Sequence, residues 1–359
     1  MQVILHFGQH DTIGAPLRDS VTAGLAQNWN TLLQNGFLLP LLAPKAEAHS
    51  LASCFTDVPL PTLAEAGHGE LLWRRIPARL HGLQAQIRLL SPKVLIICAP
   101  ERIGANAGFE AAQALYQILG KVDLHLHIPL DRPDHHLESL IGYWLLEGRT
   151  LLKFPQTLTS LTASPYVDFR QIYTPWLSVF PEAKLHLSRR SEQADASQDL
   201  AAFTRLFELP KLSPIPPTQA TVPSRAIWDS LRHANSLPGT ERKLHSQLVQ
   251  TFEPMNLPAD SEIELFGAKA RANLHAAFMP VAKALEAHLE DQSFLNDLDD
   301  ILASRSILLG SMNKQLIEQL PRFRLGRQTA GLRAVRRALI REERTNSLTR
   351  QNTHASPSR

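Results

Sequence analysis

Four short apolar segments alternate along the chain with longer segments in which apolar residues recur every three or four positions. The short segments, predicted as strands, are residues 3–7, 93–99, 123–129 and 184–188. Neighbouring parallel strands need a long crossover connection, usually a helix, and the intervening segments have that length and periodicity. We therefore expect an α/β fold for residues 1–209, with a parallel sheet flanked by helices. The predicted helices are residues 16–36, 105–120, 133–147, 166–180 and 198–207.

The pattern changes after residue 209. Five prolines lie between Pro210 and Pro223. Such a segment favours an extended chain, so residues 210–223 are predicted to be a connector. Residues 224–321 are expected to form a helix-rich C-terminal part that packs on the α/β core, followed by a basic tail at residues 322–359. The helices predicted there are residues 225–235, 240–252, 261–290 and 305–320.

Composition and apolar run length narrow the class of protein. The chain has 359 residues, of which 44% are apolar, enough for a substantial buried core. Its longest apolar runs, residues 37–43 and 94–99, are far shorter than the roughly 20 residues that span a bilayer. The sequence enters a strand without a basic leader, and Cys54 and Cys98 are expected to be reduced thiols. These features predict a cytoplasmic protein with no transmembrane segment.

Charge is concentrated at the C-terminal end. The net charge is +3, but residues 322–359 contain ten arginines and two glutamates, or +8, which leaves −5 for the remaining residues. Arginines at 333, 336, 337 and 341 could hold a nucleic acid or an anionic membrane surface by releasing counterions. However, the chain has no aromatic residue after Phe323 to stack on a base. We expect instead a helix followed by a solvated terminus, without either partner.

The first predicted strand leads into a loop that begins at Gly8 and ends near Ala15, ahead of a predicted helix. A strand, a glycine-bounded loop and a helix together form a common binding geometry for phosphate or sulfate. Asp11 lies in this loop, where an anion site would have a lysine. The loop therefore has the architecture of an anion site but the opposite charge.

Three sequence blocks, in order, resemble those of the bacterial sulfotransferase-like proteins of the P-loop class. The first is the loop just described, and the second is the run Leu137-Glu138-Ser139-Leu140. The third, weaker block runs from Tyr166 or Tyr173 through Trp176 to a strand that includes Leu187. Together the blocks cover roughly residues 1–300. The matching positions of the first block are Gly8, His10, Thr12 and Leu17.

This resemblance implies a sulfotransferase-like fold and a donor, 3′-phosphoadenosine 5′-phosphosulfate. The donor's 5′ end would occupy the first loop, and its 3′-phosphate would lie at the second block. The family moves the sulfuryl group to a hydroxyl-bearing small molecule or a glycan. The donor-binding residues carried over to this chain are Gly8, Thr12, Gly14, Arg132 and Ser139.

Two donor-site positions depart from the family pattern. Asp11 aligns with the loop lysine, and Asp131 aligns with the arginine that holds the 3′-phosphate. Replacing a cation with an anion about 4 Å from a phosphate costs about 2 kcal/mol even at water-like screening. Two such replacements are expected to lower donor affinity at least about a hundredfold. The sequence therefore predicts a degenerate donor site with impaired activity.

Two residues are candidates for the base that accepts a proton from the acceptor hydroxyl. Glu101 follows the second predicted strand at its carboxyl end, where α/β sheets place catalytic groups, and His10 lies in the first loop. The alternative interpretations are a solvated loop acid and a loop histidine with a structural hydrogen bond.

Histidines at 125, 127, 135 and 136, close to Asp131 and Asp134, allow a metal site. We predict none, because the histidines lack the spacing of common metal motifs and have no cysteine partners. Two functional hypotheses stay open: a sulfuryl transferase that acts on a carbohydrate or other hydroxyl acceptor, and a non-catalytic binding or assembly protein that uses the same fold.

Overall fold

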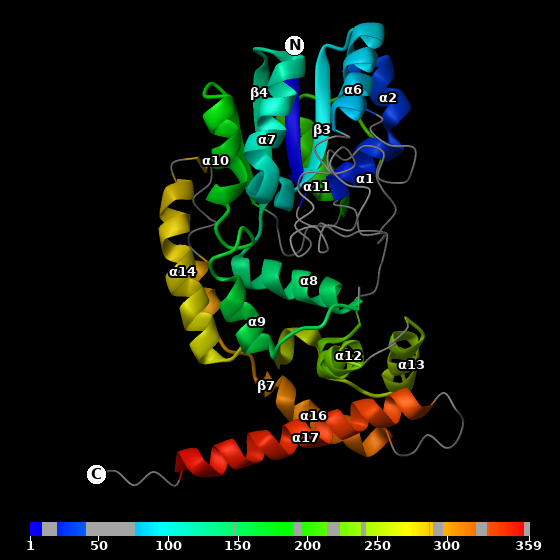
Figure 1. The fold of residues 1–359 in the computed structure, drawn as a ribbon, viewed down its shortest axis with the longest axis vertical. Helices are drawn as coiled ribbons and strands as arrows, with labels where there is room; N and C mark the ends of the chain where they lie inside the picture. Colours follow the sequence, from blue (N-terminus) through cyan, green and yellow to red (C-terminus); the bar gives the residue numbers. More distant parts are fainter. Residues whose placement is uncertain are drawn as a thin grey trace. The chain divides into compact units, whose positions relative to one another are not determined.

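The computed structural model (Figure 1) comprises two compact units. Unit 1 consists of residues 1–132, 163–220 and 278–296, and unit 2 of residues 133–162, 221–277 and 297–359. The predicted division into domains at the 210–223 connector does not use the same boundaries as these units, and it stays a prediction. The structure describes residues 1–8, 20–40, 76–146, 148–189, 196–213, 223–237, 242–286, 288–289, 297–320 and 329–354.

Unit 1 contains a five-stranded parallel sheet with the order β2-β3-β1-β4-β5. The predicted α/β class and its parallel sheet are confirmed. The four predicted strands are present, and a fifth, β2, was missed because it is only two residues long and opens a longer apolar run. The strands are β1 (Gln2–Gly8), β2 (Phe37–Leu38), β3 (Val94–Pro100), β4 (Asp123–Leu130) and β5 (Lys184–Arg189).

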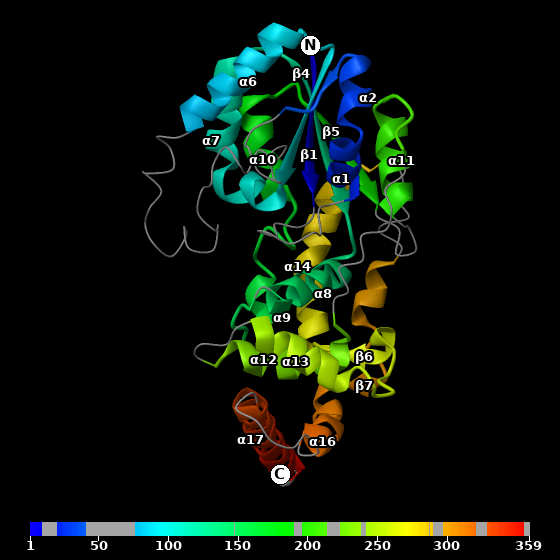
Figure 2. The same ribbon diagram turned by 90° about the vertical axis from the view of Figure 1, so that its right-hand side faces the viewer.

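Helices cover both faces of this sheet, as Figure 2 shows. On one side lie α6 (Ile76–Leu90), α7 (Glu101–Leu119) and α10 (Arg170–Val179), and on the other α1 (Ser20–Gln27), α2 (Trp29–Gln34) and α11 (Ala196–Leu206). Because side chains alternate along a strand, β1 packs against the helices on both faces of the sheet. Phe7 makes an edge contact with Trp176 of α10, whereas Ile4 joins the core that contains Leu25 of α1 and Phe203 of α11.

The helix predicted over residues 16–36 is divided in the structure into α1 and α2. Asn28 lies at the division and ties it to another segment of unit 1. Its side-chain amide donates to the carbonyls of Gly24 and Ser213, and its side-chain oxygen accepts from the backbone N–H of Ser213. An asparagine that bonds backbone groups in this way competes with a continuous helix.

Unit 2 is mainly helical. Its helices are α8 (Pro133–Leu146), α9 (Phe154–Leu161), α12 (Trp228–Asn235), α13 (Arg242–Phe252), the first part of α14 (Ala268–Glu286), α16 (Leu309–Gln319) and α17 (Thr329–His354). Short 3₁₀ turns occupy Arg225–Ile227, Asp260–Glu262 and Leu298–Leu302. Two short parallel strands, β6 (Ile263–Glu264) and β7 (Ile307–Leu308), pair within this unit.

The helix predicted over residues 261–290 is wrong in its first part, where the structure has the strand β6. Gly267 has a φ of +80°, which a right-handed helix cannot accommodate, so α14 begins only after it. Glu264 stabilises this start, because its carboxylate accepts hydrogen bonds from the backbone N–H groups of Phe266 and Gly267. A turn with a carboxylate acceptor therefore replaces the first part of the predicted helix.

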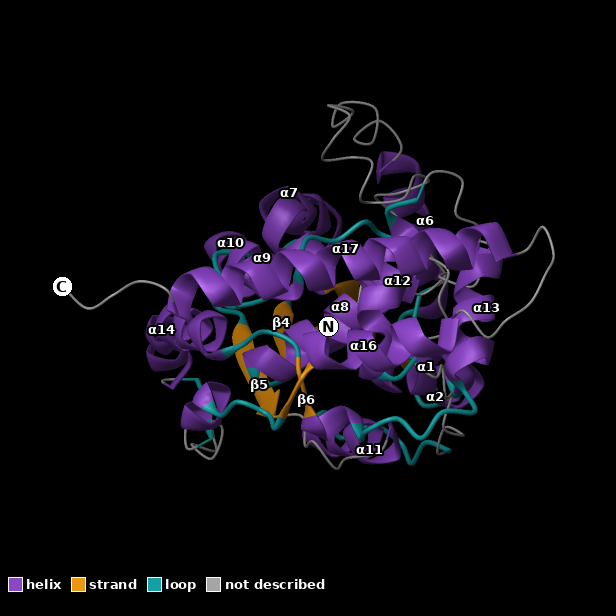
Figure 3. Ribbon diagram, turned by 90° about the horizontal axis from the view of Figure 1, so that it is seen from below, coloured by secondary structure: helices purple, strands orange, loops and turns teal. Residues whose placement is uncertain are grey.

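The basic C-terminal stretch contains α17, whose inner face belongs to the core of unit 2. Val335 and Leu339 are fully buried, and α17 packs against α12, α13 and α16 (Figure 3). A Cβ added at Gly331 would approach the side chain of Leu244 on α13 to 3.0 Å, so the two helices approach each other closely there. Of the predicted connector, residues 214–222 lie outside the described residues.

Among the helices in the described ranges, none combines the length and the apolar character that a membrane crossing requires.

Candidate functional site

The strand order of unit 1 defines a topological switch point at the carboxyl ends of β1 and β4. From β1 the chain runs to β2 at one edge of the sheet, and from β4 it runs to β5 at the opposite edge. The two strands are direct neighbours, with His6 paired to His127. Because the connections leave in opposite directions, this is the place where open α/β sheets bind ligands.

The predicted donor-loop residues begin at this switch point. Gly8 is the last residue of β1, is buried, and pairs with Pro100 of β3. His10, Asp11, Thr12 and Gly14 lie outside the described residues. The described end of β1 therefore fixes where the loop starts, and the loop's contacts with a donor stay a prediction.

Arg132 follows β4 by two residues and shares unit 1 with Gly8. Both Arg132 and its neighbour Asp131 are half-buried. Because β1 and β4 are adjacent, their carboxyl ends place one cation and one anion next to the predicted donor loop. Ser139, the other predicted contact of the 3′-phosphate, is exposed on α8 and belongs to unit 2.

Glu101 is the first residue of α7 and directly follows β3. Its backbone therefore lies at the carboxyl edge of the sheet, as the sequence predicts for a candidate base. The placement of its side chain lies outside what the structure describes. Its role as a base stays a prediction.

A row of histidines crosses β1, β4 and β5 on the sheet face that α11 covers. His6 and His127 are joined through their Nδ1 atoms at 2.8 Å, and Nε2 of His127 lies 2.9 Å from the hydroxyl of Ser188. Both rings make edge contacts with Phe203 of α11. His125 and His127 were noted in the sequence as histidines of a possible metal site, whereas His6 was missed, although the apolar run around it predicts a buried position.

The second pair in this row joins His125 to His186, with Nδ1 and Nε2 2.9 Å apart and the rings parallel. His125 also contacts the carboxylate of Asp123 at 3.2 Å. Hydrogen bonds from Lys184 and then from His125 lower the pKa of Asp123. Within the described ranges, histidine, cysteine, aspartate and glutamate do not form a group of three or more that could hold a metal ion.

We expect the His6–His127 contact to be a coupled pair. Replacing one partner of a buried hydrogen bond costs about 1–3 kcal/mol, whereas replacing both with apolar groups is nearly neutral. We therefore expect His127→Leu to lower the free energy of unfolding by that amount and His6→Leu combined with His127→Leu to recover the part that comes from leaving His6 unpaired, while the contact of His127 with Ser188 stays lost. Urea denaturation of the single and double variants measures the coupling, and additive losses would contradict it.

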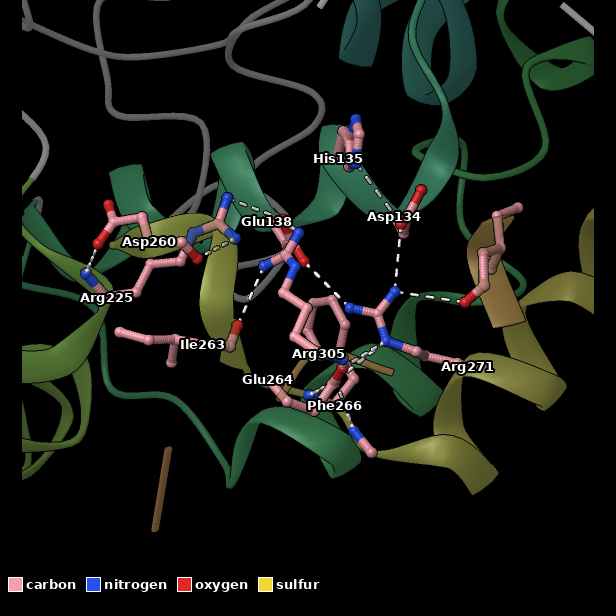
Figure 4. A network of polar contacts seen from close by, with 12 residues as sticks. Asp134, His135, Glu138, Arg225, Asp260, Ile263, Glu264, Phe266, Arg271 and Arg305 are labelled. Carbon is pink, nitrogen blue, oxygen red and sulfur yellow. Dashed lines mark hydrogen bonds and ion pairs between the residues drawn. The ribbon is translucent and has the colours of Figure 1, made fainter. Parts of the chain in front are cut away.

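Unit 2 contains a buried network of ionic side chains, drawn in Figure 4. At its centre Arg271 of α14 is 1% exposed and donates through Nε to both oxygens of Glu264, at 2.9 and 3.0 Å. Its terminal nitrogens contact Asp134 at 3.2 Å and Glu138 at 3.4 Å, both on α8. A single guanidinium thus joins three carboxylates from two segments that are far apart in the sequence.

Glu138 receives two further arginines. Its Oε2 atom accepts from Arg305 at 2.7 Å and lies 2.8 Å from Arg225. Arg225 also contacts Asp260 through its backbone N–H, at 2.9 Å. Burial raises the pKa of Glu138, and the charge and hydrogen bond of Arg305 offset only part of this effect.

Glu264 differs from Glu138 in its hydrogen-bond donors. Burial would raise its pKa, but the backbone N–H groups of Arg305, Gly267 and Phe266, together with the charge of Arg271, hold the pKa of Glu264 below its usual value. It is therefore an ionised anchor at the start of α14. Perturbed buried carboxylates can mark a functional site, but here burial explains the raised pKa of Glu138, and backbone N–H donors together with Arg271 explain the lowered pKa of Glu264.

The sequence carries a signal for this network in the spacing of two acidic residues on α8. Asp134 and Glu138 are four residues apart and share one face of α8 with Ile141 and Leu145. Carboxylates in an apolar helical stripe are buried only when they are paired. Glu138 matches the second sulfotransferase-like block, and in this structure its side chain is fully buried among arginines rather than exposed like Ser139.

A second ionic cluster fixes α17 to α12 and to the segment before α9. Glu342 of α17 contacts Arg232 and His233, at 2.5 and 2.7 Å, and Lys153 at 3.1 Å. Arg232 also pairs with Asp229 at 3.0 Å. Although burial opposes it, the hydrogen bond from His233 and the charges of Arg232 and Lys153 lower the pKa of Glu342 to about 2.

Comparisons of the chain with protein-family models, with curated proteins and with solved structures found no match. The functional interpretation therefore depends on the residues and the fold themselves.

Proposed function

We propose that the protein is a sulfotransferase-like protein with an altered donor site at the switch point between β1 and β4. The observation that supports this most is the sheet topology, because it brings the end of β1 at Gly8 beside the residues that follow β4. These are the two places where the sequence blocks of the sulfotransferase resemblance put the 5′ end and the 3′-phosphate of the donor. The agreement involves sites more than a hundred residues apart in the chain.

In this proposal the loop after Gly8, with Thr12 and Gly14, faces the 5′ end of 3′-phosphoadenosine 5′-phosphosulfate. Arg132 and Ser139 are assigned to the 3′-phosphate, with Arg132 one position away from the family's arginine. Glu101 or His10 is the candidate base for the acceptor hydroxyl, which would belong to a carbohydrate or another small hydroxyl compound. Asp11 and Asp131 oppose the donor's charge, so the proposed activity is impaired.

The second candidate is a non-catalytic binding or assembly protein that uses the same fold. The two acidic replacements favour it, because both remove a cation from the donor and add an anion in its place. The two candidates differ in one measurable property, the affinity for the donor nucleotide.

Titration calorimetry with 3′-phosphoadenosine 5′-phosphate at low salt tests the proposal. We expect weak binding by the unmodified chain and at least about a hundredfold tighter binding when Asp11→Lys and Asp131→Arg are combined, because two repulsive contacts become attractive. The matched control carries the same charge change at two exposed acids of unit 1, Glu110→Lys and Glu286→Arg.

An equal gain in the control would mean that the nucleotide responds only to net charge. Failure of both variants to bind would contradict the assignment of the donor site. Micromolar binding by the unmodified chain would favour the enzyme over the non-catalytic protein, and acceptor hydroxyl compounds would then be screened for sulfation.

A further inference from the structure

The outer face of α17 carries a stripe of four arginines. Arg333, Arg337, Arg341 and Arg344 are exposed, at intervals of four, four and three residues. At 3.6 residues per turn, these intervals place all four within an arc of about 80°. The opposite face holds the buried Val335 and Leu339, which pack into unit 2. The helix is therefore fixed to its unit by one face and presents the arginines on the other.

The charge of this stripe is not neutralised by neighbouring acids. Across the described part of the chain, none of the four guanidiniums forms an ion pair. The two acids of α17 are engaged elsewhere, Glu342 with Arg232 and Glu343 with Lys314. The stripe is thus a local excess of four positive charges facing solvent, in a chain whose residues before 322 carry a net charge of −5.

The arrangement of the arginines indicates the shape of the partner. The first and last of them are eleven positions apart, or about 16 Å along the axis of a straight helix. Since they lie on one face of the helix, a single flat anionic plane can meet all four. In a nucleic-acid duplex the phosphates follow two helical strands that complete a turn in about 34–36 Å. A straight line of about 16 Å along the duplex therefore passes few phosphates.

In contrast to the expectation from the sequence, we propose that the arginine stripe of α17 docks the protein on the surface of an anionic lipid bilayer, with the helix parallel to the membrane plane. The contact is electrostatic and needs no inserted segment. Each arginine near an anionic leaflet strengthens binding about fivefold, so four give on the order of several hundredfold. The attraction weakens steeply with salt, because the Debye length falls from about 10 Å at 0.1 M to about 3 Å at 1 M.

Sedimentation with vesicles tests this docking surface in the full chain. The probes are vesicles of phosphatidylcholine alone and of phosphatidylcholine mixed with one third phosphatidylserine, each at low and high salt. We expect binding only to the mixed vesicles at low salt, and at least a tenfold loss when the stripe is neutralised. The stripe variant is Arg333→Gln, Arg337→Gln, Arg341→Gln and Arg344→Gln.

The control variant removes the same charge from exposed positions of unit 1 and is expected to retain binding. It consists of Arg88→Gln, Arg205→Gln, Lys211→Gln and Lys283→Gln. Circular dichroism establishes that both variants keep their helices. Equal losses in the two variants, or no binding of the unmodified chain to the mixed vesicles, would overturn the proposal. Stripe-dependent binding to a short DNA duplex without vesicle binding would also overturn it, in favour of a nucleic-acid partner.

Discussion

Replacing Arg271 with methionine is expected to lower the free energy of unfolding by about 4 kcal/mol. Removing one partner from a buried ionic cluster costs about 3–5 kcal/mol, because the remaining charges stay buried without compensation. Arg271 is 1% exposed and contacts the carboxylates of Glu264, Asp134 and Glu138. Methionine keeps an unbranched side chain and most of its volume, so the loss reports mainly charge rather than a cavity. Urea denaturation followed by circular dichroism measures it.

Two further measurements separate this explanation from a general loss of packing. Adding Asp134→Asn to the Arg271→Met variant is expected to restore part of the stability, because it removes a carboxylate that the arginine had compensated. The deficit is also expected to shrink as the pH falls, since carboxyls left unpaired by the loss of Arg271 have raised pKa values and become neutral. The exposed Arg88→Met is the control, with an expected effect within about 0.5 kcal/mol. A deficit independent of pH would contradict this account.

Replacing Glu342 with glutamine is expected to lower the free energy of unfolding by about 3 kcal/mol at neutral pH. The folded-state pKa of Glu342 is about 2, below the ordinary value of 4.5. Each unit of such a shift corresponds to about 1.4 kcal/mol, and some screening by solvent reduces the total. The substitution also leaves Arg232 and Lys153 without their shared carboxylate.

The pH dependence of this effect follows from the direction of the shift. Because the pKa of Glu342 is lower in the folded state, its contribution is present above pH 4.5 and is lost as the pH falls from 4.5 towards 2. The stability curves of the unmodified chain and of Glu342→Gln should therefore converge in acid. Glu343→Gln is the matched control on the same helix, because Glu343 pairs with the exposed Lys314 at the longer distance of 3.6 Å. A constant difference between pH 7 and pH 3 would rule out the assigned role of Glu342.

The sequence predicted the sheet of unit 1 well, because buried parallel strands are marked by compact apolar runs. It missed β2, whose two residues carry no periodicity. It also predicted one continuous helix where Glu264 and Gly267 instead form a turn that starts α14. That turn depends on the contacts of Glu264 with Arg271 and Arg305, and local periodicity cannot reveal such long-range contacts.

The candidate site was predictable in position but not in detail. Strand ends follow from the sequence, and the backbones of Gly8, Glu101 and Arg132 lie at or just after the carboxyl ends of β1, β3 and β4, while their roles in a donor site stay predictions. The burial of Glu138 was not expected, because its three arginine partners come from positions 225, 271 and 305. Long-range ionic contacts of this kind are set by tertiary packing rather than by local pattern.

The central claim is that the donor nucleotide binds at the switch point between β1 and β4. Hydrogen–deuterium exchange of the Asp11→Lys, Asp131→Arg variant, with and without 3′-phosphoadenosine 5′-phosphate, tests it most directly. We predict that the nucleotide protects peptides covering residues 3–19 and 123–140 and leaves those of α17 unchanged. Nucleotide binding accompanied by protection elsewhere, with none in these two segments, would contradict the claim.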